Sequence, residues 1–198
     1  MAGGRPRAFD VDEALDRALE VFWRQGYEGT ALSDLTAAMG INRPSLYATF
    51  GNKEALFRQV LDRYAQGPAA YAARALDLPR ARDVVEALVY GAIELTTGPG
   101  TPLGCINVNT AQACGPDAEP ARHEAMTRRA ADHAALRRRL SRARAEGDVP
   151  ADSDPGALAA FVTTFIDGIA VQASGGTSRA QLRRAAAVAL RAWPGAGP

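Results

Sequence analysis

The stretch of sequence that decides the fold spans residues 35–56 and reads LTAAMGINRPSLYATFGNKEAL. Its Gly40 allows the chain to reverse after a short helix over about 31–39. Asn42 is a favourable N-cap for a second short helix, and Pro44 suits the first turn of that helix, where its missing N–H costs nothing. Two short helices joined by a glycine turn predict a helix-turn-helix motif.

Further helices are expected on both sides of this motif. Asp10 is placed to cap a first helix, which Gly26 is expected to end. Thr30 is placed to cap the helix that begins the motif. Asn52 is placed to cap a fourth helix with a strongly apolar face.

The chain is expected to divide into two helical domains. Gly67-Pro68 marks the boundary between residues 1–66, which begin with a flexible arm over 1–8, and residues 67–198. Ala and Leu dominate the composition and β-branched runs are scarce, so we expect an all-α fold with about nine helices. Beyond the boundary, the predicted helices span about 81–97, 103–113, 120–147, 154–175 and 178–193.

Composition excludes several classes of protein. A net charge of +1 over 198 residues does not indicate a general binder of polyanions, so any basic surface must be local. Cys105 and Cys114 do not make a disulfide framework. No apolar stretch approaches about 18 uninterrupted residues, and the polar start has no signal-peptide pattern. We therefore expect a cytoplasmic protein without a membrane segment.

Catalytic and metal-binding patterns are not found in the sequence. His123 and His133 do not share a helix face, and the spacing of the two cysteines does not suit zinc. Neither a glycine-rich phosphate loop nor a nucleophile elbow occurs. We therefore expect no enzyme, no metal and no cofactor. A helical interaction module without DNA binding remains the alternative class.

The helix predicted after Asn42 has a surface suited to DNA. Leu46 and Phe50 lie one turn apart and define its buried side. The opposite side has Arg43 at its start, Tyr47, small and hydroxyl-bearing residues, and no acid. A solvated helix face usually carries Glu and Lys, so this composition indicates approach to a negatively charged groove.

Phosphate contacts are predicted at the starts of neighbouring helices, because backbone N–H groups there bind anions. These starts carry Thr30, Ser33, Asn52 and Lys53. Lys53, the only lysine in the chain, opposes the dipole of its helix, and a phosphate contact explains that placement. Arg5 in the arm is a candidate for an adjacent minor groove, the alternative being a disordered terminus.

At these residues the chain resembles the TetR family of bacterial transcriptional repressors. Residues 22–30 (FWRQGYEGT) are similar to the family's end of helix one, and residues 35–56 match its helix-turn-helix almost position by position. The resemblance is strongest over 9–64 and continues more loosely, with 154–155 and 165–169 similar to its eighth helix. It implies base contacts by Arg43, Pro44 and Ser45, and phosphate contacts by Tyr47, Thr49, Lys53, Thr30 and Ser33.

The resemblance implies a repressor that a small-molecule ligand releases from its operator. Many members have a bulky aromatic or histidine pair where this chain has Ala48 and Thr49, so no operator sequence is predicted. It also implies a homodimer, because two recognition helices one DNA turn apart need a two-fold partner. The apolar faces of the helices at 154–175 and 178–193 are expected to form this interface.

A ligand pocket is implied between the helices of the second domain. Its candidate lining residues are Tyr90, Glu94, Cys105, Asn109, Phe161 and Phe165. Cys105 lies near a predicted helix start, where the dipole favours a thiolate, so an electrophile- or redox-sensing cysteine is a further hypothesis. The alternative for Cys105 is a small buried hydrophobe.

Overall fold

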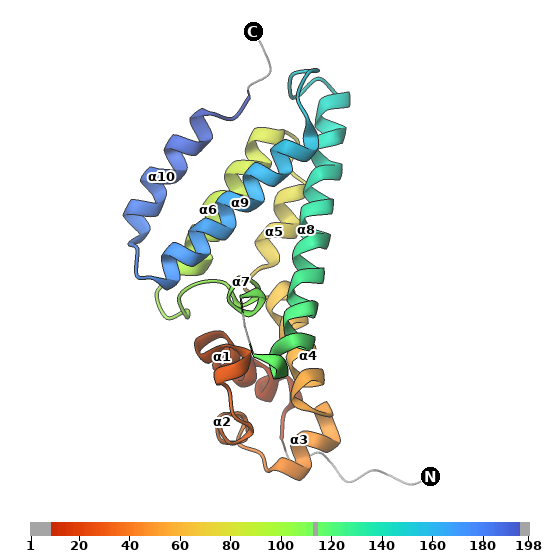
Figure 1. Ribbon diagram of the computed structural model, residues 1–198, viewed down its shortest axis with the longest axis vertical. Helices are drawn as coiled ribbons and strands as arrows, with labels where there is room; N and C mark the ends of the chain where they lie inside the picture. The colour runs from red at the N-terminus through yellow and green to blue at the C-terminus, as the bar shows by residue number, and fades with distance from the viewer. Residues whose placement is uncertain (1–8, 113–114, 195–198) are drawn as a thin grey trace.

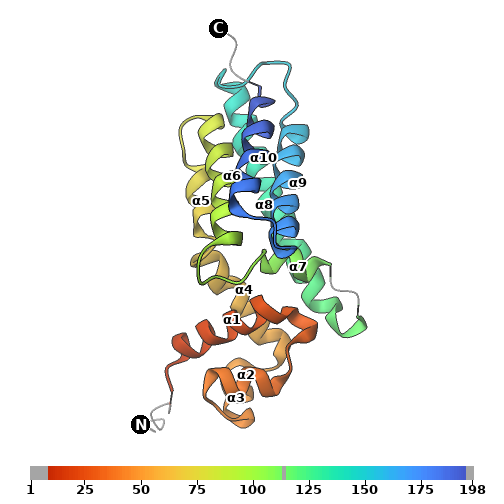
Figure 2. The ribbon, with the colours of Figure 1, turned by 90° about the vertical axis from the view of Figure 1, so that its left-hand side faces the viewer.

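The computed structural model describes residues 9–112 and 115–194, which form ten α-helices, one 3-10 turn and no strand. The all-α prediction is confirmed. Helices α1 to α3 form one end of the molecule, and α4 leads from them to a larger helical bundle at the other end (Figures 1 and 2). The elements are α1 (Val11–Gly29), α2 (Leu32–Met39), α3 (Arg43–Phe50), α4 (Lys53–Gln66), α5 (Ala70–Leu76), α6 (Ala81–Thr97), α7 (Ile106–Ala111), η1 (Pro116–Ala118), α8 (Glu119–Ala145), α9 (Pro155–Ser174) and α10 (Arg179–Arg191).

The side chains that begin three of the N-terminal helices are the expected ones. The Asp10 carboxylate accepts hydrogen bonds from two backbone N–H groups of α1, at 2.8 and 3.1 Å. Asn42 Oδ1 accepts from the N–H of Ser45 at 2.9 Å, and Asn52 Oδ1 accepts from the N–H of Ala55 at 2.7 Å. Each cap pairs an N–H group that has no partner inside its own helix. These bonds fix where α1, α3 and α4 begin.

The connection between α1 and α2 differs from the prediction. Gly26, with φ of 71°, interrupts α1 as expected, but one further helical turn follows as far as Gly29. The prediction that Thr30 caps α2 is wrong, because the N-cap is Ala31. The buried Thr30 hydroxyl instead donates to the Gly26 carbonyl at 2.6 Å, which holds the chain where the helical geometry breaks.

Helix α5 accounts for the difference between the nine helices expected and the ten in the described part of the chain. Its sequence, AYAARAL, is short and alanine-rich, and its N-cap Ala69 makes no side-chain cap bond. The conformation therefore follows from packing against α6 rather than from a local signal. Helix α7 is shorter than the predicted 103–113, and Gly104 adopts a left-handed φ of 83° just before it.

The core of the N-terminal unit is aromatic. Phe57 of α4 is fully buried and meets Phe22 and Tyr27 of α1 edge to face, with ring centroids 5.0 Å apart in each pair. Trp23 and Tyr64 form another edge-to-face pair at 4.9 Å. Such geometry adds to the free energy gained by burying the rings. Residues from the later elements also join this core: Ile106, Ala118 and Ala121.

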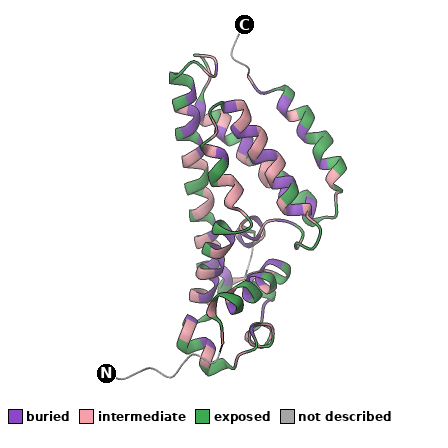
Figure 3. Cartoon of the chain, turned by 180° about the vertical axis from the view of Figure 1, so that it is seen from behind, coloured by how far each residue is buried: buried purple, intermediate pink, exposed green. Residues whose placement is uncertain are grey.

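The core of the larger bundle is aliphatic. Helices α6, α8 and α9 pack together, and α10 lies against α6. The buried side chains are mostly Ala, Val and Leu, including Val84, Val85, Leu88, Leu136, Leu140 and Val162. Figure 3 shows that α10 stays exposed over most of its surface. One side of α10, with Leu182, Ala186 and Leu190, joins this core, while the rest of the helix stays uncovered in a single chain.

Candidate DNA-binding helix and ligand cavity

Helix α3 presents a polar face at the end of the molecule remote from the bundle (Figure 1). Leu46 and Phe50 are buried, as predicted, and hold α3 against α2 and α4. The opposite side exposes Arg43, Pro44 and Tyr47, and Tyr47 has 49% of its surface accessible. The residues predicted to approach bases are therefore accessible on a rigidly mounted helix.

The charge of this face is positive. Helix α3 contains no acidic residue, and Arg43 makes no hydrogen bond or ion pair with any residue that the structure describes. Ser45 and Thr49 are half-buried and add hydroxyl groups to the same helix. A free guanidinium beside hydroxyl groups and a phenol suits phosphate oxygens and base edges.

The predicted phosphate contacts outside α3 have different surroundings. Ser33 is exposed in the first turn of α2, whereas Thr30 is buried and its hydroxyl is used within the protein. Lys53 is half-buried with Nζ 4.4 Å from the centroid of the Tyr27 ring, and this burial lowers the pKa of Lys53. The cation–π contact gives Lys53 a structural role that the sequence did not predict. Arg5 lies outside the described residues.

Side-chain contacts connect the N-terminal unit to the bundle. The Trp23 indole N–H donates to the Gly104 carbonyl at 2.9 Å. The Tyr64 hydroxyl donates to Cys105 Sγ at 3.4 Å, and an ion pair of 2.8 Å joins α4 to α8. Trp23 and Tyr64 also pack on each other, so the contacts around Gly104 and Cys105 reach both α1 and α4.

A cavity of about 610 Å³ lies between helices α4 to α9. Its wall is mostly apolar, and its volume is in the range of sites for small organic ligands. Helices α5, α6 and α8 contribute many alanine and leucine side chains to this wall. The polar groups in the wall include Tyr64, Tyr71, Cys105, Arg129, Asp132 and His133.

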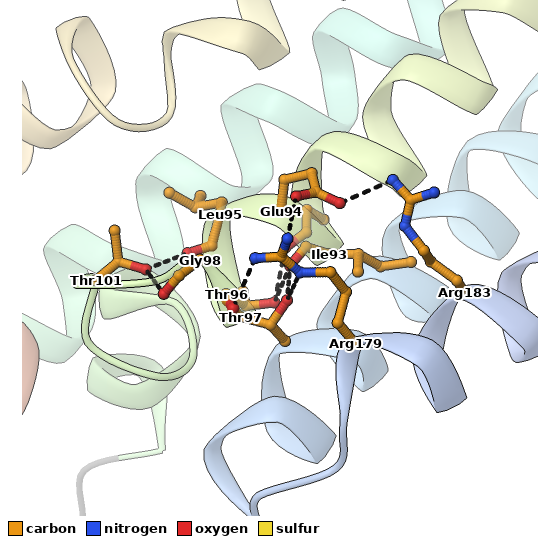
Figure 4. Close-up of polar contacts among 10 residues, drawn as sticks. Ile93, Glu94, Leu95, Thr96, Thr97, Gly98, Thr101, Arg179 and Arg183 are labelled. Carbon is orange, nitrogen blue, oxygen red and sulfur yellow. Dashed lines mark hydrogen bonds and ion pairs between the residues drawn. The ribbon is translucent and has the colours of Figure 1, made fainter.

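Of the six residues predicted to line a ligand pocket, only Cys105 lies in the wall of this cavity. Glu94 instead pairs with Arg179 at 3.0 Å and Arg183 at 2.8 Å, which project from α10 (Figure 4). The Arg183 guanidinium also lies 5.5 Å from the centroid of the Tyr90 ring. The structure therefore assigns Glu94 and Tyr90 to the contact between α6 and α10 rather than to the cavity.

The three remaining predicted pocket residues also lie outside the cavity. Asn109 borders a separate cleft with Trp23 and Ser174, and its Oδ1 accepts from the Ser174 hydroxyl at 3.4 Å. Phe161 is 42% exposed on α9, and Phe165 packs against the aliphatic core. Apolar periodicity identified these helix faces but did not indicate which face meets the cavity.

Most polar residues of the cavity wall were not predicted from the sequence. Tyr71 lies on the unpredicted α5, and Arg129, Asp132 and His133 lie on α8. Asp132 and His133 stand about one helical turn before the buried Leu136. This spacing was the signal available in the sequence.

The last two helices leave apolar side chains uncovered. Helix α9 alone, among the described residues, is long and apolar enough to cross a membrane, and only 28% of its most apolar 18-residue window is buried. Exposed apolar side chains continue on both helices, with Phe161, Val171 and Val188 at 42%, 45% and 59%. A helix buried on one side and apolar on the other fits an interface between two copies of the chain.

These features together define the class of protein. An accessible recognition helix, a cavity linked to it through Tyr64 and an uncovered apolar helix pair are the parts of a ligand-responsive transcriptional regulator. Residues 14–60 match bacterial regulatory proteins of the tetR family, and residues 81–190 match the tetracyclin repressor-like C-terminal domain. The chain belongs to the TetR family, as the sequence predicted.

Similar proteins are transcriptional regulators and cover nearly the whole chain. The HTH-type transcriptional repressor ComR of Escherichia coli (strain K12) is 38% identical over 193 residues, which are 96% of this chain and 92% of ComR. The HTH-type transcriptional regulator YezE of Bacillus subtilis (strain 168) is 34% identical over 80% of this chain and 83% of its own length.

A solved structure is similar over the same length. It contains a cysteine mutant of the TetR family transcriptional regulator CifR, complexed with 26-bp double-strand operator DNA. CifR is 42% identical, and the match covers 96% of this chain and 100% of that chain with a TM-score of 0.91. The predicted class, a DNA-binding transcriptional regulator, is confirmed.

Proposed function

We propose that this protein is a cytoplasmic, homodimeric repressor that binds its operator through α3 and leaves it when a small molecule occupies the cavity. The protein performs no catalysis in this scheme. The exposed face of α3, with its unpaired Arg43, carries the proposal. The likeness to CifR, which was solved with operator DNA, supports it.

Each accessible side chain on this face has a role that its chemistry suits. The Arg43 guanidinium has the donor geometry to reach guanine O6 and N7 in the major groove. Tyr47 and Ser33 present hydroxyl groups to phosphates and fix the register of α3 on the duplex. Ser45 and Ala48 are small, so the helix can approach the base edges closely.

Dimerisation follows from the symmetry of a two-fold operator. Two copies of α3 must be held about one helical turn of DNA apart. The uncovered apolar side chains of α9 and α10 can pair with the same surface of a second copy, which removes them from water. The contacts of Glu94 with Arg179 and Arg183 hold α10 in position for that pairing.

Ligand release requires the cavity to affect the spacing of the two recognition helices. Tyr64 belongs both to the cavity wall and to the aromatic core below it, through its edge-to-face contact with Trp23. A ligand that displaces the Tyr64 ring therefore displaces α4 and, with it, the whole N-terminal unit. The ligand shifts the population only as far as it prefers the displaced state.

Titration of an operator fragment with purified protein tests the DNA-binding part. The fragment is selected from a randomised DNA pool, and binding is measured at two salt concentrations. Arg43→Ala and Tyr47→Ala are compared with Arg138→Ala, which removes an exposed α8 arginine remote from α3. We expect Arg43→Ala to weaken binding roughly tenfold to a hundredfold and the control to leave it unchanged. Failure to select any DNA sequence would favour the helical interaction module.

Sedimentation of Val188→Asp tests the dimer. Val188 is 59% exposed in a single chain, so the substitution costs the fold little but places a charge in the proposed interface. We expect a monomer at micromolar concentration with much weaker operator binding. Asp substituted for Met126, which is 50% exposed on α8, is the control. A Val188→Asp protein that remained dimeric would contradict this interface.

Cys105 favours a second mode of release, by covalent modification. Its Sγ is in the cavity wall and accepts a hydrogen bond from Tyr64, so an electrophile in the cavity would reach a sulfur directly linked to α4. In alkylation by iodoacetamide the thiol loses its proton, the sulfur forms a bond to carbon, and the carbon–iodine bond breaks with release of iodide. The added group would displace the Tyr64 ring, which lies against this sulfur.

Iodoacetamide treatment of the operator complex tests this second mode. We expect alkylation of Cys105 to release the DNA and Cys105→Ser to remain bound, while Cys114→Ser responds like the wild-type protein. Release that persists in Cys105→Ser would exclude Cys105 as the sensing group.

A further inference from the structure

The charged side chains in the wall of the cavity, which α4 to α9 enclose, do not all have a partner of opposite charge that the structure describes. Its wall contains the guanidinium of Arg129 and the carboxylates of Asp132 and Asp167. Arg129 and Asp167 pair with each other across α8 and α9. Asp132 has no hydrogen-bond or ion-pair partner in the described part of the chain. Of these three charged groups in the wall, Asp132 is therefore the one without a direct partner in residues 9–112 and 115–194.

Asp132 is exposed, yet protein atoms near its carboxyl group disfavour the ionised form. It is accessible from the cavity, but protein atoms surround it closely enough that desolvation raises the pKa of Asp132. The nearby charge of Arg128 opposes this effect. That guanidinium is shared, because it also pairs with Asp62 and Glu124, each at 2.8 Å. A cation bound in the cavity would provide the compensation that the protein itself lacks.

Aromatic rings flank the same space. Tyr64 and Tyr71 both line the cavity, and burial raises the pKa of each phenol, so both rings are neutral. The Tyr71 ring lies directly on Gly91, where a Cβ atom would be 2.2 Å from the ring. Tyr71 is thereby held in place by α6. Tyr71 is the more accessible of the two, because Tyr64 has only 1% of its surface accessible. A neutral tyrosine ring attracts an organic cation through its face.

The other polar groups of the wall mainly offer acceptors. Asn107 Oδ1 is buried without a hydrogen-bond partner among the described residues. The Thr163 hydroxyl donates to the Ala159 carbonyl at 3.0 Å, so the 3.3 Å contact with His133 requires the imidazole Nδ1 to be the donor. With Nδ1 as the donor, Nε2 is the ring nitrogen left to face the cavity as an acceptor. Acceptors of this kind suit a ligand that carries N–H donors.

We propose that the effector of this repressor is a small organic cation, an ammonium group on an apolar body, which the Asp132 carboxylate holds beside the Tyr64 and Tyr71 rings. This inference rests on the proposed function, since it specifies the ligand that the cavity takes. The apolar wall would bind the body of the ligand and Asp132 would select its charge. An anionic ligand is disfavoured because Arg129, the guanidinium in the wall, is already paired with Asp167.

Binding of matched compounds to the full-length protein tests this selection. The probes are 2-phenylethylamine and 4-phenylbutylamine, each with the alcohol and the carboxylate of the same skeleton. Affinity is measured by calorimetry and by thermal shift, without DNA, for the wild type, Asp132→Asn and Asp152→Asn. Asp152→Asn is the matched control, because it removes an exposed carboxylate from the loop between α8 and α9.

We expect at least one amine to bind the wild type roughly tenfold to a hundredfold more tightly than its alcohol, as a charge-assisted hydrogen bond provides. Asp132→Asn should abolish this preference, and Asp152→Asn should keep it. Equal binding of the alcohol or carboxylate in both series would overturn the proposal. So would an amine preference that survives in Asp132→Asn.

Operator binding in the same preparations separates this inference from the proposed function. The amine that binds should also release the operator from the wild type and not from Asp132→Asn, although both proteins bind DNA equally in its absence. A protein that binds no operator refutes the repressor while leaving the amine selection measurable. Amine binding that leaves the operator complex intact refutes the cation as effector and leaves the DNA-binding proposal standing.

Discussion

The two ends of this molecule are packed in different ways. In the N-terminal unit, helices α1 to α4 surround an aromatic core in which Phe57 meets Phe22 and Tyr27, and side-chain caps fix three helix starts. In the bundle, long helices surround small aliphatic side chains and a cavity of about 610 Å³. Large interlocking rings leave little freedom for rearrangement, whereas a cavity lined with alanine and leucine leaves room for it. From this difference in packing we expect the N-terminal unit to move as a rigid body and the bundle around the proposed ligand cavity to deform more easily.

Removal of one aromatic ring should show the largest effect. Phe57→Ala leaves a void among Phe22, Tyr27 and the surrounding aliphatic side chains, so we expect a loss of about 3–5 kcal/mol in the free energy of unfolding. Urea unfolding at a fixed protein concentration measures it, because the stability of a dimer depends on concentration. Met126→Ala, at a residue 50% exposed, is the control. A loss below about 1 kcal/mol for Phe57→Ala would show that this core is not rigid.

A matched pair of enlarged alanines should sharpen the contrast. Ala18 is fully buried in the aromatic core, and Ala18→Leu should cost about 1–3 kcal/mol of stability through overpacking. Ala92 is equally buried but lies in the cavity wall, so the added carbons of Ala92→Leu extend into free space.

For Ala92→Leu we expect a change in stability below about 1 kcal/mol, together with weaker release of the operator by any ligand of the cavity. Both variants are compared by urea unfolding. Equal losses at the two sites would contradict the difference between the cores.

The smallest effect is expected at the surface of the N-terminal unit. Arg63 of α4 forms hydrogen bonds with both oxygens of Asp16 of α1, each at 2.7 Å, and these bonds lower the pKa of Asp16 below its ordinary value of 3.8. A carboxylate with a lowered pKa contributes stability above that ordinary value and loses it as the pH falls through the pKa of the folded state.

Asp16→Asn should therefore be slightly less stable than the wild type at pH 7, and the difference should disappear as the pH falls below the lowered pKa of Asp16. Unfolding midpoints measured across this pH range provide the test. A difference that grows on acidification would reverse the assigned sign. Because both side chains are exposed, the effect should be smaller than either core substitution.

Local signals made the N-terminal unit predictable. Asn42, Gly40 and Asn52 act within a few residues of their own positions, so the sequence was sufficient to place α2, α3 and α4. The exposed face of α3 followed from the positions of Leu46 and Phe50 for the same reason. Thr30 was misplaced because its hydroxyl had a competing acceptor, the Gly26 carbonyl, in the preceding turn.

The cavity depended on contacts that no local pattern reveals. Glu94 and Tyr90 face α10 because Arg179 and Arg183 come to them from about 85–95 residues further along the chain. Helix α5 adopts its conformation against α6, so neither the helix nor the position of Tyr71 could be deduced from its own sequence. Periodicity shows that a helix has an apolar side, but tertiary packing decides what that side touches.

The intrinsic fluorescence of Trp23 can report on the junction between the two cores. The chain has two tryptophans, Trp23 where the two cores meet and Trp193 after α10. The emission of an indole depends on the polarity and hydrogen bonding around its ring, and the Trp23 N–H is bonded to the Gly104 carbonyl at 2.9 Å. In Trp193→Phe, the remaining tryptophan emission would come from Trp23 alone. Rapid mixing with a ligand would then record the opening of the junction in real time, without a dye or a label attached.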